Sequence, residues 1–184
     1  MQAHHVRAIL FSKDQIRRRV ASLAATIAQD YAPGELTIIA VLKGSFIFLA
    51  DLVRHLTDHE LPLLVDFLLR SSYGRHATST GRVDVLSDCK VTVAGQRVLL
   101  LDDILDTGLT LQTARDLILA RGAREVRTCV LLDKPARRRV PIRPDYFGFE
   151  VADVFVVGYG LDYDGRYRQL PHIAAVTFTD QAGP

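Results

Sequence analysis

Two hydrophobic periods alternate along the chain, one typical of helices and one typical of buried strands. After a capping box that starts at Ser12, apolar side chains recur at helical spacing until Pro33-Gly34 interrupts them. Residues 36–42 (LTIIAVL) then form a continuous apolar run rich in β-branched residues, which is typical of a strand buried on both faces. A polar turn and a second helical pattern over residues 46–56 follow. The chain therefore contains a strand–turn–helix unit of an α/β fold.

Further apolar runs extend this pattern through the rest of the chain. They predict strands over residues 63–69, 98–101, 126–132, 154–159 and 173–178, a strand and turn over 91–98, and a helix that ends at Gly122. Residues 71–81 (SSYGRHATSTG) have little to bury and predict a mobile excursion. We predict a single α/β domain over residues 1–184, with a mainly parallel twisted sheet flanked by helices. Its core should span about 36–135, and a small hood lobe should form from the N-terminal segment and about 145–178.

Composition narrows the class of protein without identifying it. The 23 basic and 21 acidic residues leave a net charge of +2, which gives no support to nucleic-acid or membrane binding. The two cysteines, Cys89 and Cys129, lie far apart without metal-ligand spacing, so we expect buried thiols. The sequence has neither a signal-peptide pattern nor an apolar stretch of membrane-spanning length. A soluble cytoplasmic protein is expected.

The segment over residues 98–110 (VLLLDDILDTGLT) carries the most specific chemistry. A buried strand ends in Asp102 and Asp103, and a polar turn then opens a helix, whose N-terminal N–H groups suit phosphate. Gly108 lets the backbone approach closely, while hydroxyls of neighbouring threonines donate to phosphate oxygens. Carboxylates beside a phosphate imply ribose hydroxyls and Mg²⁺, so a sugar phosphate with a metal-bound diphosphate fits best. The alternative is that the first two aspartates only end the strand and Asp106 caps the helix.

Two other segments add candidate residues. Lys43 and Gly44 follow the strand over residues 36–42, where backbone amides and one cation could grip a diphosphate, although an ordinary surface turn is the alternative. Near the C-terminal end, Phe155 could stack on a purine, and the Val156 backbone could pair with its edge. Phe155 in an alternating strand is otherwise a core residue.

Charged residues near the same end suggest how a base and a diphosphate are bound. Lys134 could donate to an exocyclic keto oxygen and would meet no acceptor on an amino-purine. Asp162 could hold a second metal ion, and Arg168 could clamp diphosphate oxygens, unless it is a solvated surface charge. The basic cluster over residues 137–139 is interpreted as a solvated surface without a role.

Together these segments resemble the hypoxanthine-guanine phosphoribosyltransferase family, one of the type I phosphoribosyltransferases. The resemblance covers residues from about 14 to 173 and includes the signature of four apolar residues, two acidic ones, two apolar ones and Asp-Thr-Gly. Asp102 stands where the purine enzymes more often have Glu, and Leu109 stands where some relatives have Lys. Neither departure removes a phosphate-binding backbone group.

The resemblance implies a purine salvage enzyme with the type I phosphoribosyltransferase fold. It would transfer the 5-phosphoribosyl group of phosphoribosyl diphosphate (PRPP) to hypoxanthine or guanine, releasing diphosphate and forming IMP or GMP. It also implies Mg²⁺ as cofactor, small-molecule substrates, a homodimer or homotetramer, and a cis peptide bond between Leu42 and Lys43. A lid that contains Ser72 and Tyr73 would close over the site to exclude water.

The implied site residues fall into groups by role. PRPP and its diphosphate would be bound by Lys43, Gly44, Asp102, Asp103, Asp106, Thr107, Gly108, Leu109, Thr110 and Arg168. The purine would be bound by Lys134, Phe155, Val156 and Asp162, and the metal by Asp102, Asp103 and Asp162. Asp106 is the catalytic candidate, either as general base or as stabiliser of positive charge on the base or ribose.

Two other functions remain as alternatives. One is an orotate or adenine phosphoribosyltransferase, against which Lys134 and the run over residues 155–163 argue. The other is a nucleotide-sensing RNA-binding regulator built on the same fold, which should have a basic face for RNA. The near-neutral charge gives that alternative little support. The preference among hypoxanthine, guanine and xanthine stays open.

Overall fold

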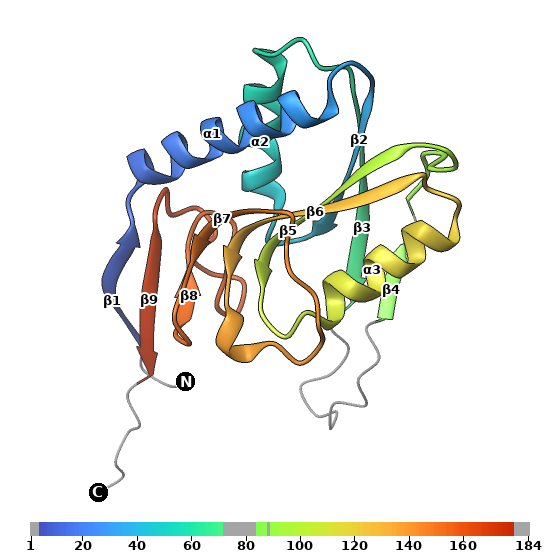
Figure 1. Cartoon of the computed structure of the whole chain (residues 1–184). Coiled ribbons are helices and arrows are strands. Elements are labelled where there is room, and N and C mark those ends of the chain that lie inside the picture. Colours follow the sequence, from blue (N-terminus) through green and yellow to red (C-terminus); the bar gives the residue numbers. More distant parts are fainter. Residues whose placement is uncertain (1–3, 72–83, 88, 179–184) are drawn as a thin grey trace, which may run out of the picture.

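The computed structural model describes residues 4–71, 84–87 and 89–178 as nine strands, three α-helices and one short 3₁₀ helix within that part of the chain (Figure 1). The elements are β1 (His4–Phe11), α1 (Lys13–Tyr31), β2 (Leu36–Leu42), α2 (Phe46–Thr57), β3 (Leu63–Ser71), β4 (Asp84–Ser87), β5 (Arg97–Leu105), α3 (Leu109–Ala120), β6 (Glu125–Asp133), η1 (Pro135–Arg137), β7 (Tyr146–Glu150), β8 (Phe155–Val157) and β9 (Ile173–Phe178). The predicted strands and helices around β2, α2, β5, α3 and β6 are all present.

The larger sheet confirms the predicted mainly parallel architecture. Its strand order is β4-β3-β2-β5-β6-β7, and every neighbouring pair is parallel except β3 with β4. Parallel strands need crossover connections, which α2 and α3 provide between β2 and β3 and between β5 and β6. As a result, the carboxyl ends of β2, β5 and β6 lie at one edge of the sheet (Figure 1).

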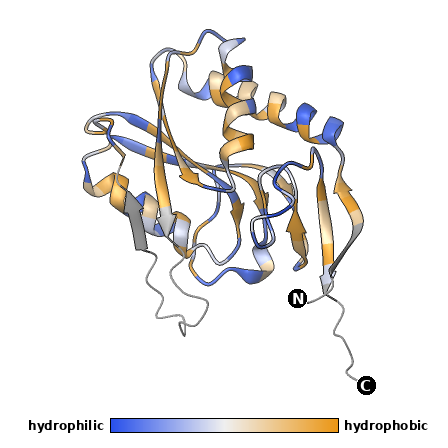
Figure 2. Cartoon of the chain, turned by 180° about the vertical axis from the view of Figure 1, so that it is seen from behind, coloured by the Kyte–Doolittle hydropathy of each residue, from blue (hydrophilic) through white to orange (hydrophobic). Residues whose placement is uncertain are grey.

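Alternate side chains of the central strands pack into two cores, one on each face of the sheet. Ile38 and Leu99 belong to the core that includes the buried faces of α1 and α2. Ile39 and Leu100, one position further along, belong to the core that includes α3. Both faces of these strands are therefore covered, which explains the continuous apolar runs in the sequence (Figure 2).

A second, three-stranded sheet forms a hood from both ends of the described chain, and its strand order is β1-β9-β8. Both pairings are antiparallel, so the two ends of the described chain lie side by side (Figure 1). The predicted hood of about 145–178 also included β7, which instead belongs to the larger sheet. Phe11 of β1 stacks on Phe149 of β7 with ring centroids 4.1 Å apart, which joins the hood to the larger sheet. Because β8 is an edge strand, one side of its backbone is not paired with β9.

Several details differ from the sequence-based expectations. Strands β1, β4 and β7 were not predicted, because polar residues or Gly148 interrupt their apolar character. Gly148 lies so close to the backbone of Leu131 that a Cβ atom there would overlap the Leu131 carbonyl. The prediction of a strand in the first part of residues 91–98 is wrong. That segment is an irregular turn, in which the Gln96 N–H donates to the Val93 carbonyl.

The two cysteines are buried free thiols, as expected from the sequence. Burial raises the pKa of both Cys89 and Cys129 above the ordinary thiol range. Cys129 belongs to the core beneath α1 and α2, and Cys89 to the core that includes α3. Among the described residues, the helices are too short or too polar to cross a membrane.

We expect both thiols of the native protein to react slowly with an aromatic disulfide reagent at pH 8, Cys129 more slowly than Cys89. The thiolate is the attacking species, and burial both disfavours it and blocks access. The measurement is the time course of thiolate release, with a denatured sample giving full and rapid reaction of both groups. A Cys89→Ser variant isolates Cys129, and rapid labelling of that native variant would contradict the packing described here.

Candidate active site

Strand β5 extends further than the apolar run predicted, and this extension places the first acidic residues. The strand was expected to end at Leu101, but it continues to Leu105 because β6 continues to pair with it. On its other side, β2 pairs with β5 only as far as Leu101. Asp102 and Asp103 therefore lie in a part of β5 that pairs with β6 but not with β2. The loop over residues 42–45 lies beside this part of the strand.

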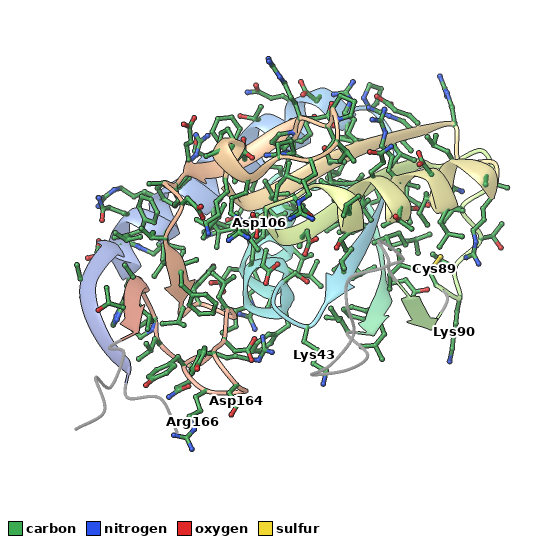
Figure 3. The ribbon with its side chains drawn as sticks, turned by 90° about the horizontal axis from the view of Figure 1, so that it is seen from below. Lys43, Cys89, Lys90, Asp106, Asp164 and Arg166 are labelled. Carbon is green, nitrogen blue, oxygen red and sulfur yellow. The ribbon has the colours of Figure 1, made fainter. Side chains whose placement is uncertain are left out.

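That loop approaches Asp103 very closely at Gly44. A Cβ atom built on Gly44 would overlap the carboxylate of Asp103, so only glycine fits there without movement. The peptide bond between Leu42 and Lys43 is cis, as the resemblance implied. The Ser45 hydroxyl donates to the Val41 carbonyl at 2.6 Å and closes the loop on β2. Lys43 is exposed at this edge, between the hood loop and the segment at Cys89 in the view of Figure 3.

A loop of the hood contacts the same place from the opposite side. A Cβ atom on Gly160, whose φ is +101°, would overlap the carbonyl oxygen of Gly44. Arg168 holds this loop, because its guanidinium donates to the Gly160 carbonyl at 2.6 Å and pairs with Asp162 at 2.7 Å. Arg168 is therefore not a solvated surface charge. The structure thus brings together three segments that are distant in sequence: the 42–45 loop, Asp103 and the hood loop.

Gly160 is a site residue that sequence reasoning did not single out. Its signal was the sequence Gly-Tyr-Gly over residues 158–160, in which both glycines have positive φ. A Cβ atom on Gly158 would overlap the carbonyl of His172, so both positions of the loop require glycine for contact as well as for conformation.

The carboxylates at the end of β5 are held by backbone donors. The Asp103 N–H donates to Asp102 at 2.9 Å, and the Ile104 N–H donates to Asp103 at 2.8 Å. Desolvation raises the pKa of Asp103, against the lowering effects of these hydrogen bonds and of the Arg168 charge. A half-buried carboxylate with a raised pKa gains from a nearby cation, which suits a hard divalent ion.

The acidic residues near Gly44 suit a magnesium ion that is bound partly by substrate oxygens, and not one that is held by protein side chains alone. Among the described residues, there is no group of three or more acidic, His or Cys side chains close enough to hold a metal. Mg²⁺ in phosphate sites is commonly bound by one or two carboxylates, substrate oxygens and water. The side chains of Asp102, Asp103 and Asp162 supply carboxylates of this kind on two sides of Gly44.

The turn after β5 forms a helix N-terminus of the kind that binds anions. Gly108 is the N-cap of α3 and has a left-handed φ of +87°. A Cβ atom there would also lie 2.7 Å from Val140 and from Ile142. Both the backbone conformation and the lack of space therefore favour glycine at this position. Thr107 precedes the cap, and Leu109 and Thr110 open the helix, whose first turn contains no acidic residue. The alternative in which Asp106 caps the helix is wrong.

Asp106 instead faces the segment that follows β6. Its Oδ1 lies 3.2 Å from Nε of Arg137, and no described residue makes a hydrogen bond to this buried oxygen. The side chain as a whole is 37% exposed, so its exposed part lies away from Oδ1. Figure 3 shows Asp106 near the middle of the face seen from below. A carboxylate with spare acceptor capacity at the edge of a sheet is suited to take a proton or a hydrogen bond from a ligand.

Lys134 begins the segment that Asp106 faces. The side chain of Lys134 is only 6% exposed, and its Nζ lies 3.7 Å from Asp153. The same carboxylate lies 3.5 Å from Arg137. Arg138 is also largely buried, pairs with Asp133 and donates to the Ile142 carbonyl at 2.8 Å. The interpretation of residues 137–139 as a solvated surface is therefore wrong for Arg138. Arg137 is exposed, as expected, but it is paired with Asp106 and Asp153.

The hood contributes an exposed aromatic ring close to this segment in sequence. Phe155 at the start of β8 is 41% exposed, so it is not a core residue, and Tyr163 contacts it edge-on with centroids 5.6 Å apart. Val156 is buried beside it on an edge strand, whose outer backbone groups do not pair with β9. A planar ring could stack on the phenyl group while its edge pairs with the backbone. The proposed lid residues Ser72 and Tyr73 lie outside the described residues.

Fold and site together define a class of protein that comparison with known families identifies. The family model for the phosphoribosyl transferase domain matches residues 9–164. The hypoxanthine-guanine phosphoribosyltransferase of Bacillus subtilis (strain 168) is 40% identical over 176 residues, which are 96% of each chain. The Aquifex aeolicus (strain VF5) enzyme of the same name is 43% identical over 91% of this chain and 93% of its own.

Solved structures give the same result. A crystal structure of a hypoxanthine-guanine phosphoribosyltransferase from Bacillus anthracis, with a HEPES molecule in its active site, matches with a TM-score of 0.87 at 41% identity. The match covers 94% of this chain and 100% of that one. The chain belongs to the hypoxanthine-guanine phosphoribosyltransferase family, as the sequence motifs indicated.

A Gly44→Ala substitution should weaken PRPP binding without unfolding the protein. The added methyl group overlaps Asp103, so the loop or the carboxylate must move. Overpacking of this kind costs about 1–3 kcal/mol, and we expect the PRPP dissociation constant to rise roughly 10- to 100-fold. Isothermal titration with PRPP and Mg²⁺ measures the effect.

Gly95→Ala is the matched control for this substitution. Gly95 also has a special conformation, with φ of +74°, but nothing lies within 4 Å of an added Cβ atom. It should lower the melting temperature through backbone strain and leave PRPP affinity unchanged. Normal PRPP binding by folded Gly44→Ala would show that the contact with Asp103 does not shape the site.

Proposed function

We infer that this protein transfers the 5-phosphoribosyl group of PRPP to hypoxanthine or guanine, forming IMP or GMP and releasing diphosphate. The observation that carries this inference is the meeting of Gly44, Asp103 and Gly160 near the end of β5, the strand whose following turn opens α3. The names of the relatives, hypoxanthine-guanine or hypoxanthine phosphoribosyltransferase, support the choice of base. The enzyme is therefore a pentosyltransferase of purine salvage.

PRPP would occupy the edge of the sheet where these segments meet. The 5-phosphate fits the turn over residues 106–110, where backbone N–H groups and the Thr107 and Thr110 hydroxyls can donate. The diphosphate fits the loop with Lys43 and Gly44, with Arg168 on the hood side. When bound, Mg²⁺ would neutralise diphosphate charge, held by Asp102 and Asp103 or by Asp162.

The purine would lie between the hood and the segment after β6. The ring of Phe155 offers a stacking surface, and the free edge of β8 at Val156 offers backbone groups for the base edge. Lys134 is a buried donor for a 6-keto oxygen, and the amino group of adenine would leave it without an acceptor. This asymmetry favours 6-oxopurines over adenine.

The chemistry at the site is a substitution at the anomeric carbon of ribose. The bond from that carbon to the diphosphate oxygen breaks, and a bond to a ring nitrogen of the purine imidazole forms. The proton on that imidazole ring must leave, and the positive charge that develops must be stabilised. Asp106 is the residue proposed for these tasks, because its side chain is 37% exposed while its buried Oδ1 faces Arg137, which leaves the exposed side of the carboxylate for the base. Water must be excluded from the same carbon, which is the purpose proposed for the lid with Ser72 and Tyr73.

We further propose that the enzyme works in the cytoplasm as a homodimer or homotetramer on small-molecule substrates. Large apolar side chains are exposed at the start of α2 and along β3: Phe46, Leu64, Val65 and Phe67. Association of copies through such side chains would remove them from water.

The purified protein should form IMP or GMP from PRPP and Mg²⁺ with hypoxanthine or guanine, and not AMP with adenine. Product analysis by chromatography tests this, with xanthine and orotate assayed in parallel. Lys134→Ala should raise the KM for hypoxanthine by roughly 10- to 150-fold, the range for a lost hydrogen bond to a charged group, while the KM for PRPP changes little. Transfer to orotate or adenine alone would refute the proposed base choice.

Asp106→Asn should reduce kcat by roughly 10²–10⁴-fold, the usual effect of removing a positioned acid or base. The substitution keeps the shape of the side chain but removes its charge and basicity. PRPP affinity should hold, because Gly108 and the helix N–H groups are unchanged. Stability should change little, since Asp106 is not the helix cap and its ion pair is partly exposed. Turnover at the parental rate by a folded variant would remove Asp106 from the chemistry.

A further inference from the structure

Four side chains of alternating charge connect the proposed catalytic carboxylate with the proposed base-binding lysine. Asp106 lies 3.2 Å from Arg137, Arg137 lies 3.5 Å from Asp153, and Asp153 lies 3.7 Å from Lys134. They come from three separate stretches of the chain: the turn after β5, the end of β6 with η1, and the loop before β8. Arg137 occupies the central position, because it alone of the four contacts both carboxylates in the described structure through different nitrogens.

The contact between Arg137 and Asp106 has an unusual geometry. Nε and Oδ1 lie within ion-pair distance, but the geometry is not that of a hydrogen bond, and no described residue makes one to Oδ1. Arg137 therefore supplies positive charge and covers one oxygen without using its directional acceptor capacity. The exposed side of the carboxylate is left for a ligand.

Contacts of the next two residues hold the segment that carries Arg137 beside Asp106. The Arg139 N–H donates to the Thr107 carbonyl at 2.9 Å, which ties the segment after β6 to the turn that contains Asp106. Arg138 fastens the same segment through Asp133 and through the Ile142 carbonyl. Asp153 then fixes the outer end of the Arg137 guanidinium from the hood side. An arginine held at both ends loses little further freedom when substrate binds.

We propose that Arg137 is a positioning residue for the transfer reaction, acting through Asp106, with Asp153 as its anchor. This inference rests on the proposed function, since it assigns a residue to the same site. Arg137 places a positive charge beside Oδ1 of Asp106 and holds the carboxylate so that its exposed side faces the base. The planar guanidinium is needed because one nitrogen contacts Asp106 while another contacts Asp153.

The position of Arg137 distinguishes this role from binding of diphosphate. The diphosphate candidates converge at Gly44, where Arg168 is joined to Gly160 and Asp162. Arg137 is instead joined through Asp153 to Lys134, on the side proposed for the purine. Loss of Arg137 should therefore change kcat rather than the KM for PRPP.

The test is a double-mutant cycle between Arg137→Gln and Asp106→Asn, measured as IMP formation from PRPP and hypoxanthine. Arg137→Gln alone should lower kcat about 10-fold, in the range for groups in direct contact, with the KM for PRPP and the melting temperature little changed. In the Asp106→Asn background, the same substitution should change kcat less than about 2-fold, because its route of action is already lost. Arg137→Lys, which keeps charge but not the two-nitrogen fork, should recover only part of the loss.

Arg139→Gln is the matched control, because Arg139 is an exposed arginine of the same cluster. The kcat of this variant should equal that of the parent protein. If Arg137→Gln unfolds, Asp153→Asn is the second variant. It removes the anchor of Arg137 and also the partner of Lys134. Loss of the anchor should lower kcat in a smaller but Asp106-dependent way, whereas an effect through Lys134 would raise the KM for hypoxanthine in both Asp106 backgrounds. Equal losses in both backgrounds, or a raised KM for PRPP with unchanged kcat, would overturn the proposal. A parent protein that forms no IMP would instead refute the proposed function, so the two failures are distinguishable.

Discussion

The close approach of the 42–45 loop to the end of β5 is the constraint on which the rest of the site depends. It requires β2 to stop pairing with β5 at Leu101, so that the space beside Asp103 is taken by Gly44 instead of by another strand residue. The hood loop then rests on the carbonyl of Gly44 through Gly160, and Arg168 secures that loop. Neither contact leaves room for a Cβ atom. A larger residue at Gly44 or Gly160 would therefore push the hood loop and the end of β5 apart.

The continuation of β5 beside β6 determines where the charged groups lie relative to one another. Because the pairing persists to Leu105, the carboxylates at the strand end and the segment that begins at Lys134 emerge together at the same edge. The turn at Gly108 packs against that segment, and Arg139 donates to the turn. The proposed phosphate end and the proposed base end of the site are thus joined by backbone contacts as well as by charges.

Two kinds of feature could be predicted from the sequence. One is a strand that is buried on both faces, and the other is a turn whose conformation is set by its own residues. The strand β2 and the turn at Gly108 are examples, because local apolarity and local conformation decide both. The sequence could not predict how far β5 continues, since partner pairing rather than apolarity decides that. It also could not show that Asp153 joins Arg137 and Lys134, because a polar residue in a loop gives no signal of a distant partner.

The order of strands in the hood has a consequence for how the protein is made. β1 is the first strand of the described chain, but its partner β9 is the last, and β9 is also the only described neighbour of β8. During synthesis, the larger sheet has all its strands before the hood can close. A ribosome-bound chain that lacks β9 therefore has the sheet edge proposed to bind phosphate, but β8, which carries Phe155, has no paired strand beside it. The sheet that carries Phe155 is therefore completed only after β9 has been made, later than every strand of the larger sheet.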